Sequence, residues 1–205
     1  FGVRGGATGV NVSGATQVSY CFHDVAGYSK FGSYSGSGSS GNAVTLGFRP
    51  SFLMIKRVDA AGEWVIVDST RNPTNPANLI LCANDTSKEA DFGTTNRNID
   101  LTSTGFTIQS TAAGGTTALN NSSGTYIYIA FAGGLDSIAP VNTSGTIESR
   151  VKANPTYGQS IVSYAGASNA TGDSSNNGGS YWTIGHGLSQ APELILVKKR
   201  NSTAN

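Results

Sequence analysis

Short apolar runs bounded by Gly, Asn, Ser or Pro recur along the chain, and helical periodicity is nearly absent. Apolar or alternating runs of this kind between turn residues are typical of β-strands. The pattern predicts strands at residues 17–23, 30–34, 43–46, 51–58, 64–68, 79–82, 99–101, 105–109 and 126–132. We therefore expect an all-β protein.

Two kinds of apolar run indicate two packed sheets. Residues 52–55 are apolar at every position, as in a strand covered on both faces, whereas residues 126–129 alternate Tyr with Ile. The predicted fold is a β-sandwich, either jelly-roll-like or immunoglobulin-like. Asp59-Ala60-Ala61-Gly62 supplies a turn between two of the runs, so we expect a hairpin over residues 51–68.

The chain also repeats itself. Residues 28–36 read YSKFGSYSG and residues 157–166 read YGQSIVSYAG, so that each segment ends in Ser-Tyr-x-Gly. Residues 50–57, PSFLMIKR, likewise match residues 192–200, PELILVKKR. We expect Tyr34 and Tyr164, and likewise Pro50 and Pro192, to occupy equivalent places in superposable units.

The start of the chain resembles the end of the central unit. Residues 1–4 match 106–109, and residues 18–22 match 127–131. This predicts a tandem array in four parts, with closing strands of a preceding repeat at 1–24, a complete β-sandwich repeat at 25–134, a linker at 135–154 and opening strands of a following repeat at 155–205. The linker is expected to be an extended connector or one helical turn. We expect residues 17–23 to pair with 160–164 or 194–197, within one chain or between neighbours.

Composition removes several classes of partner. Charged residues make up 12% of the chain, and 13 Lys and Arg against 12 Asp and Glu leave a net charge of +1. No charge excess is present to attract a nucleic acid or an anionic membrane, and no apolar run approaches the roughly 18 residues that cross a bilayer. We expect neither nucleic-acid binding nor membrane insertion. The two cysteines, Cys21 and Cys82, lie in apolar runs where buried thiols and a disulfide are both open.

Groups that carry catalysis are few. The two histidines, His23 and His186, have no His, Cys or Glu neighbours at metal-ligand spacing. Residues 36–41 satisfy G-x-G-x-x-G, but a dinucleotide fingerprint opens a helix and a strand is predicted here at 43–46. We expect no catalytic residue, no metal ligand and no cofactor. Whether loop oxygens hold Ca²⁺ is left open.

The acidic residues are expected to be solvated groups at turns and strand ends. They include Asp59, Glu63, Asp68, Asp85, Glu89 and Asp91. A glycosidase needs only two carboxylates about 5–10 Å apart, so a catalytic pair among them stays formally open. Exposed aromatic rings can stack on a sugar, and the candidates are Trp64, Tyr34, Trp182 and Tyr181. Core packing is favoured for Tyr34, because the second repeat segment also has a tyrosine, Tyr164, at the same position. Ligand-binding residues are therefore not assigned.

Three segments carry a resemblance to a known family. Residues 20–34, YCFHDVAGYSKFGSY, residues 47–57, GFRPSFLMIKR, and residues 160–164 with 184–198, SIVSY and IGHGLSQAPELILVK, resemble a tandem β-rich repeat domain of unknown function. That domain occurs in tail-fibre and virion-associated proteins of marine bacteriophages. The resemblance covers nearly the whole chain and implies an extracellular location on the virion surface.

The first functional prediction is a non-enzymatic structural repeat module of a tail fibre or similar virion appendage, packed as a homo-oligomer or against neighbouring fibre subunits. A trimer is expected by analogy with phage fibres in general. The alternative is a receptor-recognition module that binds bacterial surface glycan through the Gly/Ser/Asn-rich loops at 35–42 and 167–180. A polysaccharide depolymerase is the third alternative.

Overall fold

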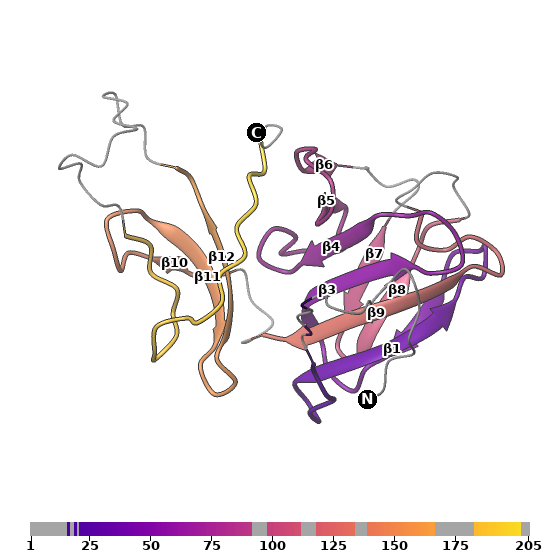
Figure 1. The fold of residues 1–205 in the computed structure, drawn as a ribbon, viewed down its shortest axis with the longest axis horizontal. Helices are drawn as coiled ribbons and strands as arrows, with labels where there is room; N and C mark the ends of the chain where they lie inside the picture. Colours follow the sequence, from indigo (N-terminus) through magenta and orange to yellow (C-terminus); the bar gives the residue numbers. More distant parts are fainter. Residues whose placement is uncertain are drawn as a thin grey trace.

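The protein is all-β. The computed structural model describes residues 16, 19, 21–91, 98–111, 118–133, 139–166 and 183–201, and every regular element in these ranges is a strand. No helix long and apolar enough to cross a membrane occurs in the described ranges. The strands form three sheets, and all of their pairings are antiparallel (Figure 1).

The strand bounds follow the predicted apolar runs closely. They are β1 (Ser29–Ser35), β2 (Asn42–Thr45), β3 (Pro50–Arg57), β4 (Trp64–Asp68), β5 (Leu79–Cys82), β6 (Ala90–Asp91), β7 (Ile99–Thr102), β8 (Gly105–Ile108), β9 (Thr125–Ala132), β10 (Val141–Asn142), β11 (Ser149–Asn154) and β12 (Gln159–Tyr164). Eight of the nine predicted strands are present, each within one residue of its predicted ends. The ninth, at 17–23, lies partly outside the described residues, and those described within it form no strand.

Two sheets build the central part of the chain, residues 25–133, which we call the sandwich. A six-stranded sheet in the order β1-β9-β3-β4-β5-β6 faces a three-stranded sheet in the order β2-β8-β7 (Figure 1). Side chains from both sheets form one buried cluster, whose largest members include Leu53, Ile55, Ile99, Phe106 and Tyr126. This confirms the predicted β-rich fold of two packed sheets.

The predicted hairpin over residues 51–68 is confirmed as β3 and β4, which pair from Phe52 with Asp68 to Lys56 with Trp64. Leu53 and Ile55 are completely buried between the sheets. On the opposite face of β3, Phe52 is only half-buried, where it packs against Phe131 with ring centroids 6.1 Å apart. The second face of this strand is therefore covered only in part, because no further sheet packs on it within the described ranges.

A third sheet, β10-β11-β12, follows the sandwich, and we call it the C-terminal sheet. It includes β10 and β11 from the segment predicted as a linker, so the described part of that segment is extended and contains no helical turn. The strands β11 and β12 pair along their whole length, from Ser149 with Tyr164 to Asn154 with Gln159. Figure 1 shows this sheet beside the sandwich, and the chain from 183 to 201 first crosses the sheet near β10 and then runs between the sheet and the sandwich to the C-terminus.

We call residues 183–201 the C-terminal segment. The sequence repeat predicts a strand in this segment that matches β3, and the structure shows none there. Pro50 is fully buried at the start of β3, whereas Pro192 lies in a stretch without any strand. Tyr34 is half-buried in β1, whereas its counterpart Tyr164 is 41% exposed at the end of β12. The structure therefore does not place Pro192 in a strand as it does Pro50, whereas Tyr34 and Tyr164 both lie near the end of a strand, β1 and β12. A strand needs neighbours to pair with, and β3 has β4 and β9, but residues 192–200 have no strand beside them in the described chain.

The described residues at the start of the chain lie on the sandwich. Phe22 stacks on Phe31 of β1 at 5.7 Å and meets Phe131 of β9 edge-on at 6.3 Å. Asp24 accepts hydrogen bonds from the Lys30 ammonium at 2.5 Å and from the Phe31 amide at 2.9 Å. The contacts described for residues 22–24 are thus with 25–134. The predicted pairing of 17–23 with 160–164 or 194–197 stays a prediction, because residues 17, 18 and 20 lie outside the described residues.

Candidate functional site

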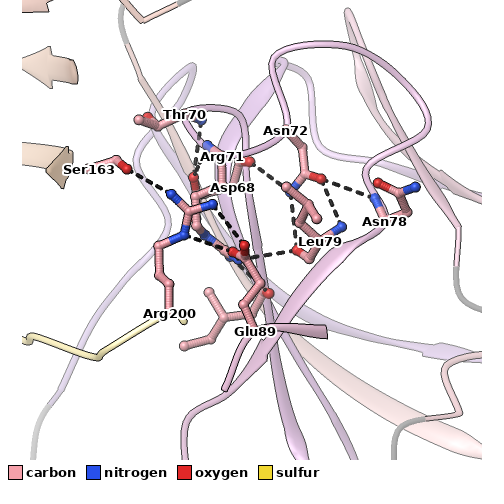
Figure 2. Close-up of polar contacts among 10 residues, drawn as sticks. Asp68, Thr70, Arg71, Asn72, Asn78, Leu79, Glu89, Ser163 and Arg200 are labelled. Atoms are coloured by element: carbon pink, nitrogen blue, oxygen red, sulfur yellow. Dashed lines mark hydrogen bonds and ion pairs between the residues drawn. The ribbon is translucent and has the colours of Figure 1, made fainter. Parts of the chain in front are cut away.

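The candidate site is the junction where the C-terminal segment meets the sandwich. A groove of about 900 Å³ opens there between the end of β12 and the end of the C-terminal segment. Its lining residues are Lys88, Glu89, Val162–Gly166 and Val197–Asn201. Beside it lies the densest group of charged side chains that the structure describes (Figure 2).

Asp68 and Arg71 form the inner part of this charged group. Asp68 ends β4, and its carboxylate accepts hydrogen bonds from the main-chain amides of Thr70 at 3.1 Å and Arg71 at 2.9 Å. This Asx-type turn brings the Arg71 guanidinium back over the same carboxylate, with Nε 2.5 Å from Oδ2. Both side chains are 5% exposed, so water screens their attraction only weakly.

Asn72 fixes the loop that presents Arg71. Its side-chain amide donates to the carbonyl oxygens of Asp68 and Leu79, both at 3.2 Å. Its Oδ1 accepts from the main-chain amides of Asn78 at 3.1 Å and Leu79 at 2.9 Å (Figure 2). One buried side chain therefore closes the loop between β4 and β5, and the position of Arg71 does not depend on long-range contacts alone.

Glu89 connects the sandwich to the C-terminal segment. Its carboxylate accepts from Arg71 Nη1 at 2.8 Å on one side and from Arg200 Nε and Nη2 at 3.0 and 2.7 Å on the other. Its main-chain amide donates to the Arg200 carbonyl at 2.8 Å. Arg200 Nη1 then donates to Ser163 Oγ of β12 at 2.9 Å. One carboxylate thus joins the sandwich, the C-terminal segment and the C-terminal sheet.

The electrostatics of this group keep Glu89 ionised. Burial alone raises the pKa of Glu89, but hydrogen bonds from Arg200 and Arg71 outweigh burial and hold the pKa below its ordinary value. The pKa of Arg200 is raised, mainly by its hydrogen bond to Glu89. A carboxyl group in this state accepts hydrogen bonds and cannot supply a proton near neutral pH.

Three further contacts fix the C-terminal parts to the sandwich. Tyr157, in the turn between β11 and β12, stacks on Tyr28 with ring centroids 4.1 Å apart and planes 15° apart. Lys152 of β11 is 6% exposed and donates from Nζ to Ser69 Oγ at 3.1 Å. Lys198 Nζ donates to the Asp85 carbonyl at 2.5 Å. The C-terminal sheet is therefore held near both ends of β12.

Asp68 and Glu89 correct the expectation that the acidic residues are solvated turn formers. Their side chains are 5% and 12% exposed, because each lies within reach of a guanidinium. The other acidic groups fit the expectation better. Asp59 pairs with Arg57 at 2.8 Å near the surface, and this hydrogen bond lowers the pKa of Asp59 to about 2.

The histidines take part in local contacts only. His23 is exposed, and its Nδ1 lies 2.8 Å from the Asp24 carbonyl oxygen. His186 Nδ1 accepts from the Leu188 amide at 3.1 Å in the turn that follows it. Within the described ranges, no group of three or more His, Cys, Asp or Glu residues is placed to hold a metal ion. Cys21 is exposed and Cys82 is half-buried in β5, and the two are not joined in a disulfide.

Of the four aromatic candidates for sugar stacking, the structure describes Tyr34 and Trp64. The ring of Tyr34 stacks on Tyr126 at 4.9 Å, and its hydroxyl donates to the Leu119 carbonyl at 2.7 Å. Burial raises the pKa of Tyr34 well above its ordinary value. Trp64 is half-buried at the start of β4. Tyr181 and Trp182, with the whole of the loop at 167–180, lie outside the described residues.

The sequence analysis missed both arginines of the junction. A signal for Arg71 was present, since an Arg three residues after a strand-ending Asp can fold back onto it. Arg200 carried no comparable signal, because its partner Glu89 is 111 residues away along the chain. Only the packing of the C-terminal segment on the sandwich brings the two together.

Fold and junction together define a class of protein, a β-sandwich with an accessory antiparallel sheet fixed to it by aromatic and charged contacts. The chain belongs to the family described as a domain of unknown function (DUF7483), which matches residues 2–134 and 136–205. Comparisons with curated proteins and with solved structures found no match.

Proposed function

We propose that the chain is a structural repeat module of an extracellular fibre, such as a phage tail fibre or a similar virion appendage. The junction carries the proposal. The C-terminal sheet is fixed to the sandwich by an aromatic stack, a buried lysine and a cluster of ion pairs. A fibre needs successive units held at constant angles, and contacts of these three kinds meet that need.

Composition and family membership support the same proposal. The family matches the chain as two segments, which agrees with an array of related units. Few charges and abundant Ser, Thr and Asn suit a spacer that is exposed to solvent. In such a fibre the partners of the chain are further fibre subunits, packed as a homo-oligomer on the virion surface.

Glu89 argues against a depolymerase. Among the described residues, Asp68 and Glu89 are two carboxylates that the fold brings close to each other, since both bind Arg71. A glycosidase requires one carboxyl group that stays protonated until it donates to the leaving group. The pKa of Glu89 is lowered instead, by hydrogen bonds from Arg200 and Arg71 that outweigh burial. This pair therefore suits a structural role.

The alternative function, recognition of a glycan, is supported by the groove at the junction but not by the loop at 35–42. The side chain of Asn120 binds the loop at 35–42: its Oδ1 accepts from the Ser37 main-chain amide and the Asn42 side chain, and its Nδ2 donates to the Ser39 carbonyl. Many polar groups of this loop are therefore used internally. The groove at the junction is more favourable, because Lys88, Lys198 and Lys199 line it, whereas Arg200 is paired with Glu89. Three lysines suit an acidic glycan, which we keep as the second candidate ligand.

Small-angle X-ray scattering of the full chain tests the proposed function. We expect one fixed arrangement of the sandwich and the C-terminal sheet to fit the profile, and Arg200→Ala to give a profile that needs several arrangements. A wild-type profile that already needs several arrangements would contradict a rigid spacer. A glycan array run in parallel should show no binding. Acidic-glycan binding that is lost in Lys198→Ala/Lys199→Ala would establish recognition instead.

A further inference from the structure

Four consecutive apolar side chains of the C-terminal segment lie in water. Leu194, Ile195, Leu196 and Val197 have exposed fractions of 63, 68, 85 and 70%. A continuous apolar run is typical of a strand that has neighbours on both sides and cover on both faces. Exposed as a patch, such a run marks a contact surface.

The sandwich indicates which neighbour this run requires. By sequence, residues 192–200 correspond to β3, and β12 corresponds to β1. In the sandwich, β9 lies between β1 and β3 and is antiparallel to both. The groove at the junction lies between β12 and the end of the C-terminal segment. It therefore occupies the place that β9 fills in the sandwich.

The two walls of the groove are also in matching register. In the sandwich, Tyr34 and Arg57 both face Tyr126 of β9. Their sequence counterparts, Tyr164 and Lys199, both line the groove. The strand β12 stands at the edge of its sheet, with its second side toward the groove. An extended segment could pair there through main-chain hydrogen bonds.

The chain contains a second segment with the β9 pattern, because residues 18–22 match residues 127–131. The described residues around it, Thr16, Ser19 and 21–24, are all exposed, and none lies in a strand. Asp24 and Phe22 are bound to the sandwich of their own chain. We propose that residues 17–23 of a second copy enter the groove as a strand antiparallel to β12 and to residues 192–200.

This arrangement joins the start of one copy to the end of another. A head-to-tail contact of this kind is heterologous, so it builds rings or filaments and not closed two-fold dimers. The inference rests on the proposed fibre function and names the partner as a second copy of the chain. The four exposed apolar residues would then gain the neighbour strand that β3 has in β9.

The register gives a covalent test. In the sandwich, Lys30 faces Ala130. The counterparts of these two residues are Ser160 and Cys21, so Ser160→Cys should form a disulfide with Cys21 of a second copy. We expect oxidised full-length Ser160→Cys to give a ladder of oligomers on a non-reducing gel. The double variant Ser160→Cys/Cys21→Ser should give no ladder. The matched control Gln159→Cys should give at least about tenfold less cross-linked oligomer than Ser160→Cys, because the side chain of residue 159 points to the other face of the strand.

Equal cross-linking of Ser160→Cys and Gln159→Cys, or a ladder that survives Cys21→Ser, would overturn the proposed register. Sedimentation equilibrium of the unmodified chain gives a second measurement, and a monomer at every concentration would overturn the proposal. A synthetic peptide of residues 125–132 that fills the groove while a peptide of residues 15–24 does not would assign the groove to another strand. The cross-linking and peptide failures leave the fibre function to the scattering test, whereas a monomer at every concentration would also contradict the homo-oligomeric packing proposed for the fibre.

Discussion

Arg71 shows how one buried side chain can hold a junction together. Its guanidinium bonds the carboxylates of Asp68 and Glu89 and also donates to the carbonyl oxygens of Ile66 and Leu79, both at 3.2 Å. A buried ion pair adds little stability by itself, but removing one partner leaves an uncompensated charge, which costs about 3–5 kcal/mol. The group therefore fixes one arrangement of the chain more than it strengthens the fold.

Glu89 should make the stability of the junction depend on pH. In the folded chain its pKa lies below the ordinary value of 4.5, because hydrogen bonds from Arg200 and Arg71 outweigh burial. A lowered pKa contributes stability that is present above the unfolded value and is lost as the pH falls through the folded value. We expect the free energy of unfolding of the wild type to fall below about pH 4.5, and that of Glu89→Gln to fall less steeply.

Urea unfolding at pH 6 and at about pH 3.5 measures this difference. Glu89→Gln should have a lower free energy of unfolding than the wild type at pH 6, and the difference between the two free energies should be smaller at the lower pH. Parallel stability curves for the two proteins would show that Glu89 does not carry the effect.

At the scale of elements, Gly36 follows β1 directly and occupies a position that only glycine fits. Its amide donates to the Gly124 carbonyl at 2.7 Å, and its carbonyl accepts from the Ser123 amide at 3.0 Å. A Cβ atom at this position would lie 2.0 Å from the Asn121 carbonyl oxygen, and the two hydrogen bonds prevent the backbone from moving away. We expect Gly36→Ala to lower the free energy of unfolding by about 2 kcal/mol.

Gly166 offers a matched control, because a Cβ atom there would meet nothing within 4 Å. Thermal unfolding followed by circular dichroism should show a lower midpoint for Gly36→Ala and almost no change for Gly166→Ala. An unchanged midpoint for Gly36→Ala would mean that the loop between β1 and β2 yields easily.

The elements also show what sequence patterns can and cannot predict. The hairpin of β3 and β4 was predictable, because an apolar run, a turn and a second run are local signals. The strand β11 was not, since its Arg150 and Lys152 make it look solvated, whereas Lys152 is buried against the sandwich, where its ammonium donates to Ser69. The run at 194–197 has the composition of a strand but forms none, because pairing depends on a neighbour and not on the run itself. The ion-pair cluster depends in the same way on partners far apart in the chain.

At the scale of the whole molecule, the sandwich has a core and the C-terminal sheet has almost none. All residues of the main buried cluster lie between Tyr28 and Ala132. After residue 133, the buried apolar residues of the described chain are Ala139 and Val151. The C-terminal sheet must therefore take its stability from contacts with the sandwich.

Tyr157→Ala tests this dependence, because it removes the ring that stacks on Tyr28. Loss of an aromatic pair costs about 1 kcal/mol, so amide hydrogen exchange in β11 and β12 should become about fivefold faster. Exchange in β9 should not change. The comparison variant is Tyr164→Ala, which removes a ring of similar exposure from the end of β12. Equal effects of both variants on β11 would argue against coupling through the stack.

The central place of β9 has a consequence for the growing chain. The hairpin of β3 and β4 is complete at Asp68, but its neighbour β9 ends only at Ala132. A ribosome that adds about 5–20 residues per second needs some 3–13 s for the stretch between them. During that interval the apolar edge of β3 has emerged and its partner has not. During synthesis the unpaired apolar edge of β3 is thus exposed for seconds and can aggregate. A cell that makes this chain in quantity must keep nascent chains apart or supply a chaperone.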